Sequence, residues 1–435
     1  MTVIHKILLL VLPILSISFA ILQPRISLFG IFRSLSPSLN VSPSTCRSIE
    51  GLEACEDAWI DHELGFAYLA CSSRETRSKW SPPLGLLSAS SLPPTSLDTL
   101  QFFSFSSGLS STIELSGLPA SSSGLYVHGL EGYISPSTPS LLTLFVISHR
   151  PPSPRSLAPE TGAESVIEIF ELERGRSHAN WVGTVESDLI VTPNNLVATG
   201  GTSFFVSNDH KRKVHWSRKL EMVYSEPSSI VHCDASRPNG EDPCIVALDG
   251  IAYPNGIAQL PNSSTLFVAS TMTGEITTYE IQSDYTLFPL PAKISLNRPI
   301  DNIHVSPSTS SIYASTFPKM LKFMSAAQAG GLESSRMNDN PVEIWRIEEE
   351  KGEGRFYGHQ YKSSLVLSDP ENEVVSSITT AAPFENKLLL TGESLFSSFR
   401  TLSTSFELTE SRSWSIMTVG YFTERAVVCE MPEIL

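Results

Sequence analysis

The residues best suited to chemistry are carboxylates and amides spread along the chain, namely Glu56, Asp57, Asn194, Asn195, Asn255, Asp301 and Asn302. Their side chains all carry hard oxygen atoms, and no cysteine or histidine pair with zinc-site spacing accompanies them. Calcium accepts several carboxylate and amide oxygens in irregular geometry, so this set favours calcium over zinc or magnesium. Because a linear calcium loop of the EF-hand type is absent, distant segments would have to assemble the site.

A repeated unit could bring these residues to one place. Residues 255–270 are echoed by residues 301–315, since each run begins with a polar residue and continues as a short apolar strand, a turn and a second strand. Looser copies begin at residues 56–57, 128–129, 194–195 and 377–378, which makes six starts. In a β-propeller the first strand of each blade lines the central channel, so these polar residues would face one axis. Any single one of these polar residues could be an ordinary turn residue, but their repetition at equivalent positions favours a location facing the channel axis.

Short strands dominate the pattern after the N-terminal leader. Apolar or alternating runs bounded by Gly, Pro, Asn and Ser occur at residues 66–70, 141–148, 166–172, 203–206, 265–269, 312–315, 342–347 and 387–390. We therefore predict an all-β fold, a six-bladed β-propeller over residues 41–435, after a leader and linker over residues 1–40. We expect inserted loops at four poorly patterned stretches, residues 81–124, 151–162, 325–340 and 400–413. Some of these loops could cover one mouth of the channel.

The overall composition excludes one class of partner. The net charge is −15, from 45 acidic and 30 basic residues, so most of the surface would repel a phosphate backbone. Nucleic acid is therefore not an expected partner. Hydrophobic residues make up 41% of the chain and charged residues 17%, which is enough apolar material for a large buried core.

The first residues indicate entry into the secretory pathway. Lys6 precedes an apolar stretch at residues 7–22, and residues 18–20 have the small-x-small character of a cleavage site. The stretch is also close to the length that spans a bilayer, so a cleaved peptide and a retained membrane anchor both stay open. We expect a secreted or membrane-anchored protein with a lumenal or extracellular propeller. The sequons at Asn40 and Asn262 are candidate glycosylation sites that agree with this location.

Six cysteines in a secretory chain allow disulfides. A bridge between Cys46 and Cys429 would tie the first and last parts of the fold together. Two closer pairs could each staple one loop: Cys55 with Cys71, and Cys233 with Cys244. The sequence alone does not fix this connectivity.

Several motifs, in their order along the chain, resemble those of the paraoxonase/arylesterase family. They are Glu56-Asp57 after Gly51-Leu52-Glu53, His128-Gly129, Ile147-Ser148-His149, the run from Asn194 to Gly200, Ser207-Asn208-Asp209-His210, Asn255-Gly256-Ile257 and Asp301-Asn302-Ile303. The resemblance spans roughly residues 46–431 and is weakest across the expected inserted loops. Each motif is weak by itself, whereas the ordered set is specific.

The resemblance implies a fold, an activity and roles for particular residues. It implies hydrolysis of small-molecule lactones and aryl esters, in some members also of organophosphates, and a propeller closed by Cys46 and Cys429. The catalytic calcium would be bound by Glu56, Asn194, Asn255, Asp301 and Asn302, with a second, structural calcium near Asp57. A cation there would polarise the carbonyl and stabilise the oxyanion formed when water attacks. His128 would activate the water and His149 would orient His128; alternatively both support the channel wall by hydrogen bonding.

Two positions depart from the family pattern. Asn195 stands where the family usually has Asp, which removes a negative charge from the second calcium site and could weaken or empty it. Phe317-Pro318 stands where the family has a histidine before proline, so the shape of the pocket and the preferred substrate should differ.

Other functions remain possible on the same fold. The main alternative is a non-catalytic propeller that keeps calcium for stability and serves as a binding or scaffold protein. Gluconolactonase-like and strictosidine-synthase-like propellers are a third possibility. A serine hydrolase is disfavoured, because no Gly-x-Ser-x-Gly elbow is present. Neither the physiological ester nor the oligomeric state can be predicted from these patterns.

Overall fold

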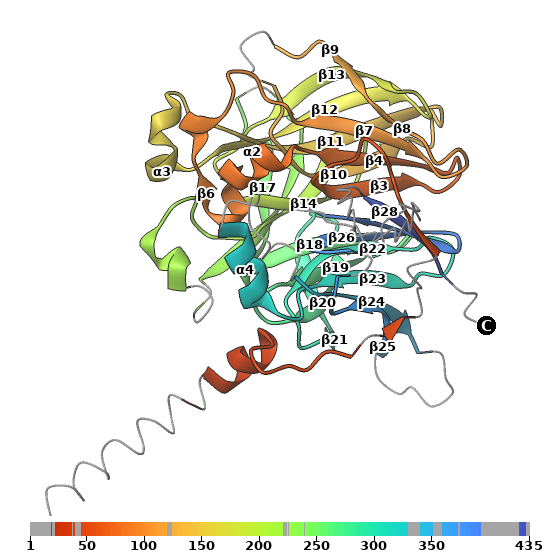
Figure 1. The fold of residues 1–435 in the computed structure, drawn as a ribbon. Coiled ribbons are helices and arrows are strands. Elements are labelled where there is room, and N and C mark those ends of the chain that lie inside the picture. The colour runs from red at the N-terminus through yellow and green to blue at the C-terminus, as the bar shows by residue number, and fades with distance from the viewer. Residues whose placement is uncertain are drawn as a thin grey trace, which may run out of the picture.

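The computed structural model describes residues 19, 22–36, 38–39, 45–119, 124–220, 224, 226–238, 240–328, 340–350, 359–372, 375–392 and 426–431. Within these residues, strands form six sheets of four or five strands arranged around a central axis (Figure 1). Nearly all neighbouring strands are antiparallel, and the accompanying helices are short. The predicted six-bladed β-propeller is therefore confirmed.

The first three blades follow one another along the chain, each with its innermost strand first. The first blade consists of β3 (Cys55–Asp61), β4 (Phe66–Cys71), β7 (Thr99–Ser104) and β8 (Ser110–Thr112). The second consists of β10 (Val127–Ile134), β11 (Leu141–Arg150), β12 (Glu164–Glu173) and β13 (His178–Val185), with β9 (Glu114–Ser116) at its outer edge. The third consists of β14 (Pro193–Ala198), β15 (Ser203–Asn208), β16 (Pro227–Asp234) and β17 (Cys244–Ala252).

The last three blades include strands from both ends of the described chain. The fourth consists of β18 (Pro254–Gln259), β19 (Thr265–Ser270), β20 (Glu275–Ile281) and β21 (Leu287–Ser295). The fifth consists of β22 (Ile300–Val305), β23 (Ile312–Thr316), β24 (Val342–Glu349) and β25 (Tyr361–Asp369), with β1 (Ser38–Leu39) at its edge. The sixth consists of β26 (Thr380–Phe384), β27 (Lys387–Thr391), β28 (Val427–Glu430) and β2 (Cys46–Ser48).

The innermost strands form a closed ring. β3 contacts β10, β10 contacts β14, and the contacts continue through β18, β22 and β26 back to β3. The ring closes in the sixth blade, where β2 pairs with β28 and a disulfide joins Cys46 to Cys429. The polar residues that begin the six predicted repeat units lie in these innermost strands or just before them. All six units therefore begin on the side of their blade that is nearest the axis.

Apolar side chains fill the spaces between adjacent blades. Phe145 of the second blade packs on Phe204 of the third, with ring centroids 5.0 Å apart. Phe267 of the fourth blade meets Tyr361 of the fifth edge to face at 5.7 Å. Because the middle strands are covered on both faces, they appear in the sequence as nearly continuous apolar runs. This packing holds the inner strands rigidly around the axis.

The stretch 81–124 differs from the expected inserted loop. It contains β7 and β8, the third and fourth strands of the first blade, and β9 at the edge of the second. Leu100 and Phe103 of β7 are buried, but the surrounding serines and prolines hide the strand pattern in the sequence. The stretch 151–162 holds only short helices, η4 (Arg155–Leu157) and α3 (Ala158–Thr161). Residues 329–339 and 400–413 lie outside the described residues.

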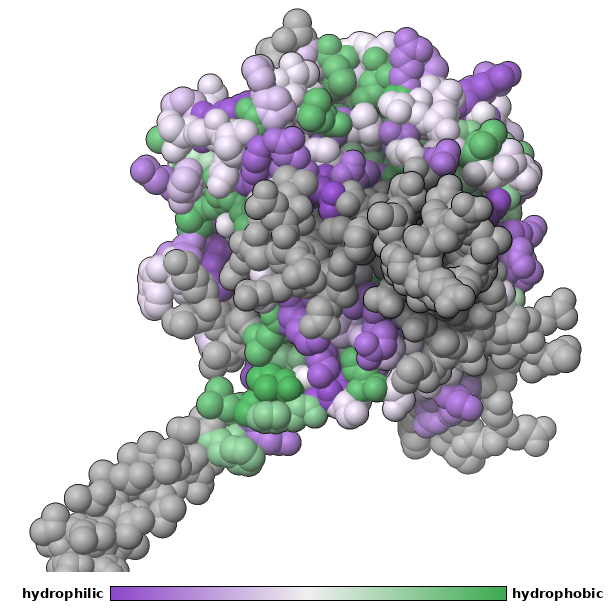
Figure 2. All heavy atoms as spheres, in the orientation of Figure 1, coloured by the Kyte–Doolittle hydropathy of each residue, from purple (hydrophilic) through white to green (hydrophobic). Residues whose placement is uncertain are grey.

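The short helices lie on one side of the propeller, on the left in Figure 1, and include α2 (Arg74–Lys79) and α4 (Met320–Gln328). The segment that follows the leader joins them, because Leu28 and Phe29 are buried against Phe317 and Met320. The Met320 amide donates a hydrogen bond to the Phe29 carbonyl oxygen. Figure 2 shows apolar residues gathered where this segment meets the propeller, and Phe32 is 86% exposed.

The structure contains two further disulfides, Cys55–Cys71 and Cys233–Cys244, so all six cysteines are paired. Asn262 is exposed in the turn between β18 and β19, whereas Asn40 lies outside the described residues. No helix in the described part of the chain combines the length and the apolar character needed to cross a membrane. The apolar stretch 7–22 lies almost entirely outside that part.

Candidate metal centre and active site

The inner strands of five blades are irregular at their polar residues. Their register with the next strand shifts between Cys55 and Asp57, Val127 and Leu130, Pro193 and Leu196, Pro254 and Ile257, and Ile300 and Ile303. A β-bulge bends a strand and changes the direction of the side chains at the extra residue. These irregular stretches contain Glu56, His128, Asn194, Asn255 and Asp301, so the chain turns its polar side chains toward the axis.

Close approach of neighbouring inner strands requires glycine beside one of these residues. A Cβ atom on Gly256 would lie 2.6 Å from the Ile303 nitrogen and 2.7 Å from the Asn302 Cα atom, which no side chain could accept without movement. Gly256 therefore allows β18 to lie directly against β22. As a result, Asn255 comes close to Asp301 although the two residues are far apart in sequence.

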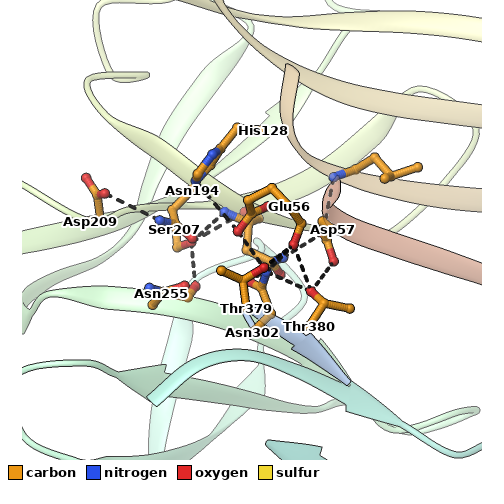
Figure 3. A network of polar contacts seen from close by, with 12 residues as sticks. Glu56, Asp57, His128, Asn194, Ser207, Asp209, Asn255, Asn302, Thr379 and Thr380 are labelled. Atoms are coloured by element: carbon orange, nitrogen blue, oxygen red, sulfur yellow. Dashed lines mark hydrogen bonds and ion pairs between the residues drawn. The ribbon is translucent and has the colours of Figure 1, made fainter. Parts of the chain in front are cut away.

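A cavity of about 750 Å³ opens beside the converging residues. Its polar lining includes Glu56, His128, Asn194, Asn255 and Asp301. We call this space the calcium-side cavity, after the predicted calcium ligands that line it. All of these side chains are almost completely buried within the protein, between 1% and 6% exposed. Figure 3 shows Glu56, Asn194 and His128 next to one another, with Asn255 approaching from the fourth blade.

Two amide oxygens in this group lack a protein partner. Oδ1 of Asn194 and Oδ1 of Asn255 are buried and accept no hydrogen bond from the described residues. Their amide nitrogens are held elsewhere: Asn255 Nδ2 donates to Thr271 Oγ1 at 3.1 Å, and Asn194 Nδ2 donates to Asp209 Oδ2 at 3.4 Å. Leaving a buried acceptor unsatisfied costs about 1–3 kcal/mol, so we expect a cation or a hydrogen-bond donor to contact these two oxygens.

Glu56 is held by residues of the fifth and sixth blades. Asn302 Nδ2 donates a hydrogen bond to Glu56 Oε1 at 2.9 Å. Thr379 Oγ1 and Thr380 Oγ1 donate to the Glu56 carbonyl oxygen at 2.6 Å and 3.0 Å. His128 Nε2 lies 3.9 Å from Glu56 Oε1. The carboxylate is therefore oriented before any ligand binds.

Asp209 and His210 support Asn194 from behind. Asp209 Oδ1 contacts His210 Nδ1 at 2.7 Å, while its other oxygen accepts the hydrogen bond from Asn194. Burial by itself would raise the pKa of Asp209, but the charge and hydrogen bond of His210, together with Arg218, outweigh it and lower the pKa to about 2. Asp209 is therefore ionised at neutral pH and holds the Asn194 amide in one orientation.

The two predicted histidines are neighbours in the wall of the second blade, with their rings tilted by 52° to each other. Their ring centroids are 5.2 Å apart, and His149 Nδ1 lies 2.9 Å from Ser165 Oγ. His128 lines the calcium-side cavity, whereas His149 lies behind it. Burial lowers the pKa of His149 to about 3 and lowers the pKa of His128 well below its usual value. Both imidazoles are therefore neutral at neutral pH, and a neutral imidazole can accept a proton.

The remaining predicted metal residues lie apart from the calcium-side cavity. Asp57 and Asn195 line a second cavity of about 800 Å³, which we call the opposite cavity, together with His304. Asn302 lies between the two cavities and is fully buried. Thus the structure brings Glu56, Asn194, Asn255 and Asp301 to one cavity and Asp57 and Asn195 to another. Asn302 is hydrogen-bonded to Glu56 on one side and to Asn195 on the other.

The donor set of the calcium-side cavity fits a hard cation. It offers two carboxylates and two amide oxygens, of which the amide oxygens have no protein partner. Calcium accepts such oxygens and commonly takes six to eight ligands, which leaves positions for water or a substrate. Within the described residues, no group of three or more His, Cys, Asp and Glu side chains could hold a metal by itself. The amide oxygens are therefore an essential part of the candidate site.

Some residues of the site had little signal in the sequence. Thr379 and Thr380, which support Glu56, begin the sixth blade, where the repeat was loosest. The buried partners of Asn194 occur in the motif Ser207-Asn208-Asp209-His210, but sequence spacing gave no indication of what Asp209 holds.

The outer wall of the calcium-side cavity is apolar. Leu84, Met272, Phe317, Met320 and Phe323 contribute to it, and Phe317 stacks on Phe323 with ring centroids 4.0 Å apart. Lys213 and Arg218 are also part of the lining. Arg218 is held by the carbonyl oxygens of Lys213, Pro82 and Pro83, so it fixes the loops of the wall. The cavity thus combines a polar floor with a largely apolar wall, as small-molecule sites commonly do.

Comparison with known proteins identifies a matching family and individual relatives. The family described as Arylesterase matches residues 111–353. Serum paraoxonase/arylesterase 1 of the rat is 24% identical over 266 residues, which cover 60% of this chain and 64% of that protein. The human protein of the same name is 26% identical over 161 residues, which cover 37% of this chain and 43% of that protein. Each match thus spans less than two thirds of the relative. Among solved structures, a luciferin-regenerating enzyme aligns with a TM-score of 0.45 at 11% identity, covering 88% of this chain and 94% of that one.

Proposed function

Because the chain belongs to the Arylesterase family, we propose that it is a calcium-dependent hydrolase of lactones or aryl esters. Membership of the family supports hydrolysis of small esters in general. The dependence on calcium and the roles of individual residues are our inference from the geometry of the calcium-side cavity.

One observation carries the proposal. The unpaired amide oxygens of Asn194 and Asn255 line the same cavity as Glu56 and Asp301, and His128 lies beside them. A merely structural cation would not need ligands that border an open cavity, whereas a catalytic one must be accessible to substrate. The arrangement therefore supports an enzyme over a scaffold protein.

A calcium ion held by Glu56, Asn194, Asn255 and Asp301 would polarise the carbonyl group of the substrate. His128 borders the cavity as a neutral imidazole, so it can take the proton of a water molecule as the water oxygen bonds to the carbonyl carbon. The proton is then returned to the leaving oxygen as the ester C–O bond breaks, and the products are an acid and an alcohol. In a lactone both groups remain on one molecule. His149, held near Ser165, fixes the orientation of the His128 ring.

The apolar wall indicates how the rest of the substrate would bind. Phe317 and Phe323 offer an aromatic surface, and Met320 and Met272 beside them are flexible side chains that adapt to different shapes. An aliphatic chain or an aryl group of the ester would lie against this wall and be removed from water. Phe317 supplies neither a proton nor a charge, so this wall contributes to binding alone.

Replacing Glu56 with glutamine tests the proposal. The change removes the negative charge at the candidate cation while the side chain keeps its size, so hydrolysis of phenyl acetate and of aliphatic lactones should fall by about 100-fold. Calcium chelation of the wild-type protein should cause a similar loss, reversed by added calcium. The Asp284→Asn variant is the control, because it makes the same chemical change in an exposed turn.

Three results would oppose the proposal. Full activity after complete removal of metal would exclude the role of calcium. Unchanged turnover in Glu56→Gln would exclude the proposed ligand. Absence of hydrolysis across the whole panel, with calcium still bound, would favour the non-catalytic scaffold.

We also propose that the protein acts in the secretory pathway or outside the cell. The three disulfides support this location, because they form and persist in oxidising compartments. Asn262 is exposed and can receive a glycan in the same compartments. A shift in mass after glycosidase treatment, absent from Asn262→Gln, would test the modification.

A further inference from the structure

The carboxylate of Asp57 is fully satisfied by groups of the protein itself. Its Oδ1 accepts a hydrogen bond from the Ala58 nitrogen at 2.9 Å and lies 3.1 Å from Thr380 Oγ1. Its Oδ2 accepts from the Leu130 nitrogen at 3.2 Å and from Asn195 Nδ2 at 3.0 Å. Asp57 is only 1% exposed. Its two oxygens therefore already have the partners that a buried carboxylate needs.

The orientation of the Asn195 amide is fixed by the backbone. The Ile257 nitrogen donates a hydrogen bond to Asn195 Oδ1 at 3.1 Å, so the oxygen faces the fourth blade. The amide nitrogen must then point the other way, where it donates to Asp57 Oδ2 and to Asn302 Oδ1. Turning the amide over would place a nitrogen against the Ile257 amide and an oxygen against the Asp57 carboxylate. Both contacts would be repulsive.

Asn302 continues this network to the calcium-side cavity. Its Oδ1 accepts from Asn195 Nδ2 at 3.1 Å, and its Nδ2 donates to Glu56 Oε1 at 2.9 Å. The polar atoms of Asp57, Asn195 and Asn302 are all paired, in contrast to the unpaired Oδ1 atoms of Asn194 and Asn255. The two ends of the axis therefore differ: one offers oxygens to a cation, and the other offers N–H groups to a carboxylate.

We propose that this chain holds no metal at Asp57, and that the side-chain amide of Asn195 takes the place of a second, structural calcium. A cation beside Asp57 would face the NH₂ group of Asn195, which carries partial positive charge and has no lone pair to donate. The inference rests on the proposed function only for the first ion, in the calcium-side cavity. The absence of a metal at Asp57 follows from the orientation of the Asn195 amide and does not depend on that first ion.

The same geometry predicts how a second metal site could be created. An Asn195→Asp substitution keeps the size of the side chain but replaces the NH₂ group with an oxygen. That oxygen would face Asp57 Oδ2 and Asn302 Oδ1, the two acceptors that the amide now serves. Three oxygens with two negative charges would then meet in a buried place, which is unfavourable unless a cation binds between them.

The number of calcium ions bound per chain distinguishes the candidate site in the calcium-side cavity from a site at Asp57. Four proteins are compared after equilibrium dialysis against calcium and elemental analysis: wild type, Asn195→Asp, Glu56→Gln, and the double variant. We expect one, two, zero and one calcium per chain, respectively. The control is Asn180→Asp, which introduces the same charge at an exposed position and should match wild type with one. A second readout uses Glu56→Gln alone, whose thermal midpoint should not change between chelator and millimolar calcium, since no second ion is present to be removed.

Each outcome has a definite meaning. Two ions in the wild type, one ion retained by Glu56→Gln, or a calcium-dependent midpoint in that variant would overturn the inference. An Asn195→Asp protein that folds and binds no more calcium than wild type would overturn it as well. If wild type binds no calcium while Asn195→Asp binds one, the proposed function fails at the calcium-side cavity, and the inference about Asp57 stands.

Discussion

Breaking the disulfide between Cys46 and Cys429 should weaken the propeller more than breaking either of the other two. This bridge closes a loop with a sequence separation of 383 residues, and the pairing of β2 with β28 that accompanies it spans only three residue pairs. In the chain-entropy description, a cross-link that closes a loop of this length raises the free energy of the unfolded chain by about 6 kcal/mol and stabilises the folded protein by that amount. The bridge between Cys233 and Cys244, with a separation of 11 residues, corresponds to about 3 kcal/mol in the same description.

Urea unfolding of paired alanine variants gives the comparison. Cys46→Ala/Cys429→Ala should lose about twice as much free energy of unfolding as Cys233→Ala/Cys244→Ala, and its sixth blade should be the first region to exchange its amide hydrogens. Both variants remove two buried sulfur atoms, so the cost of the lost packing is similar. Equal losses in the two variants would refute the reasoning, because loop length would then have no influence.

Two further predictions concern single histidines. His128→Gln should lower kcat for lactones by about 10²–10⁴-fold with calcium content unchanged, because the variant lacks the proton acceptor; near-normal turnover would reject the role. His232, buried and stacked on Tyr285, has its pKa lowered to about 4 by burial, so its neutral form is favoured in the folded state. Stability should therefore fall as the pH decreases from about 6.5 toward 4, by about 1 kcal/mol at pH 5 after allowance for solvent screening. His232→Gln should show a smaller fall in thermal midpoint over this range, and an identical pH profile would contradict the assignment.

The sequence predicted the architecture well because a propeller repeats. The apolar runs at residues 203–206 and 265–269 lie inside β15 and β19, and each follows a polar blade start by a similar interval. Repetition averages out local ambiguity, since one unit confirms the interpretation of the next. The strand β7 was missed for the opposite reason: it lies in a serine- and proline-rich stretch whose buried Leu100 and Phe103 form no recognisable copy of the unit.

The site was harder to predict because neighbouring residues belong to different ends of the axis. Glu56 and Asp57 are adjacent in sequence, yet Glu56 lines the calcium-side cavity and Asp57 the opposite one. Asn194 and Asn195 divide in the same way. Such alternation follows from the pleat of a strand and from its bulges, whose exact positions are not visible in the sequence. The orientation of the Asn195 amide depends on the Ile257 nitrogen of another blade, a long-range contact that no local pattern encodes.

The buried network from Glu56 to Asp57 also separates the two cavities along the axis. The two cavities share no lining residue, and the side chains of Asn302 and Thr380 are packed between them. Within the described residues, the two cavities are therefore separate, with this network between them. Under the proposed function, an ester would enter, and its acid and alcohol would leave, on the side of the calcium-side cavity that α4 lines. Product release would then have to precede the entry of the next substrate molecule.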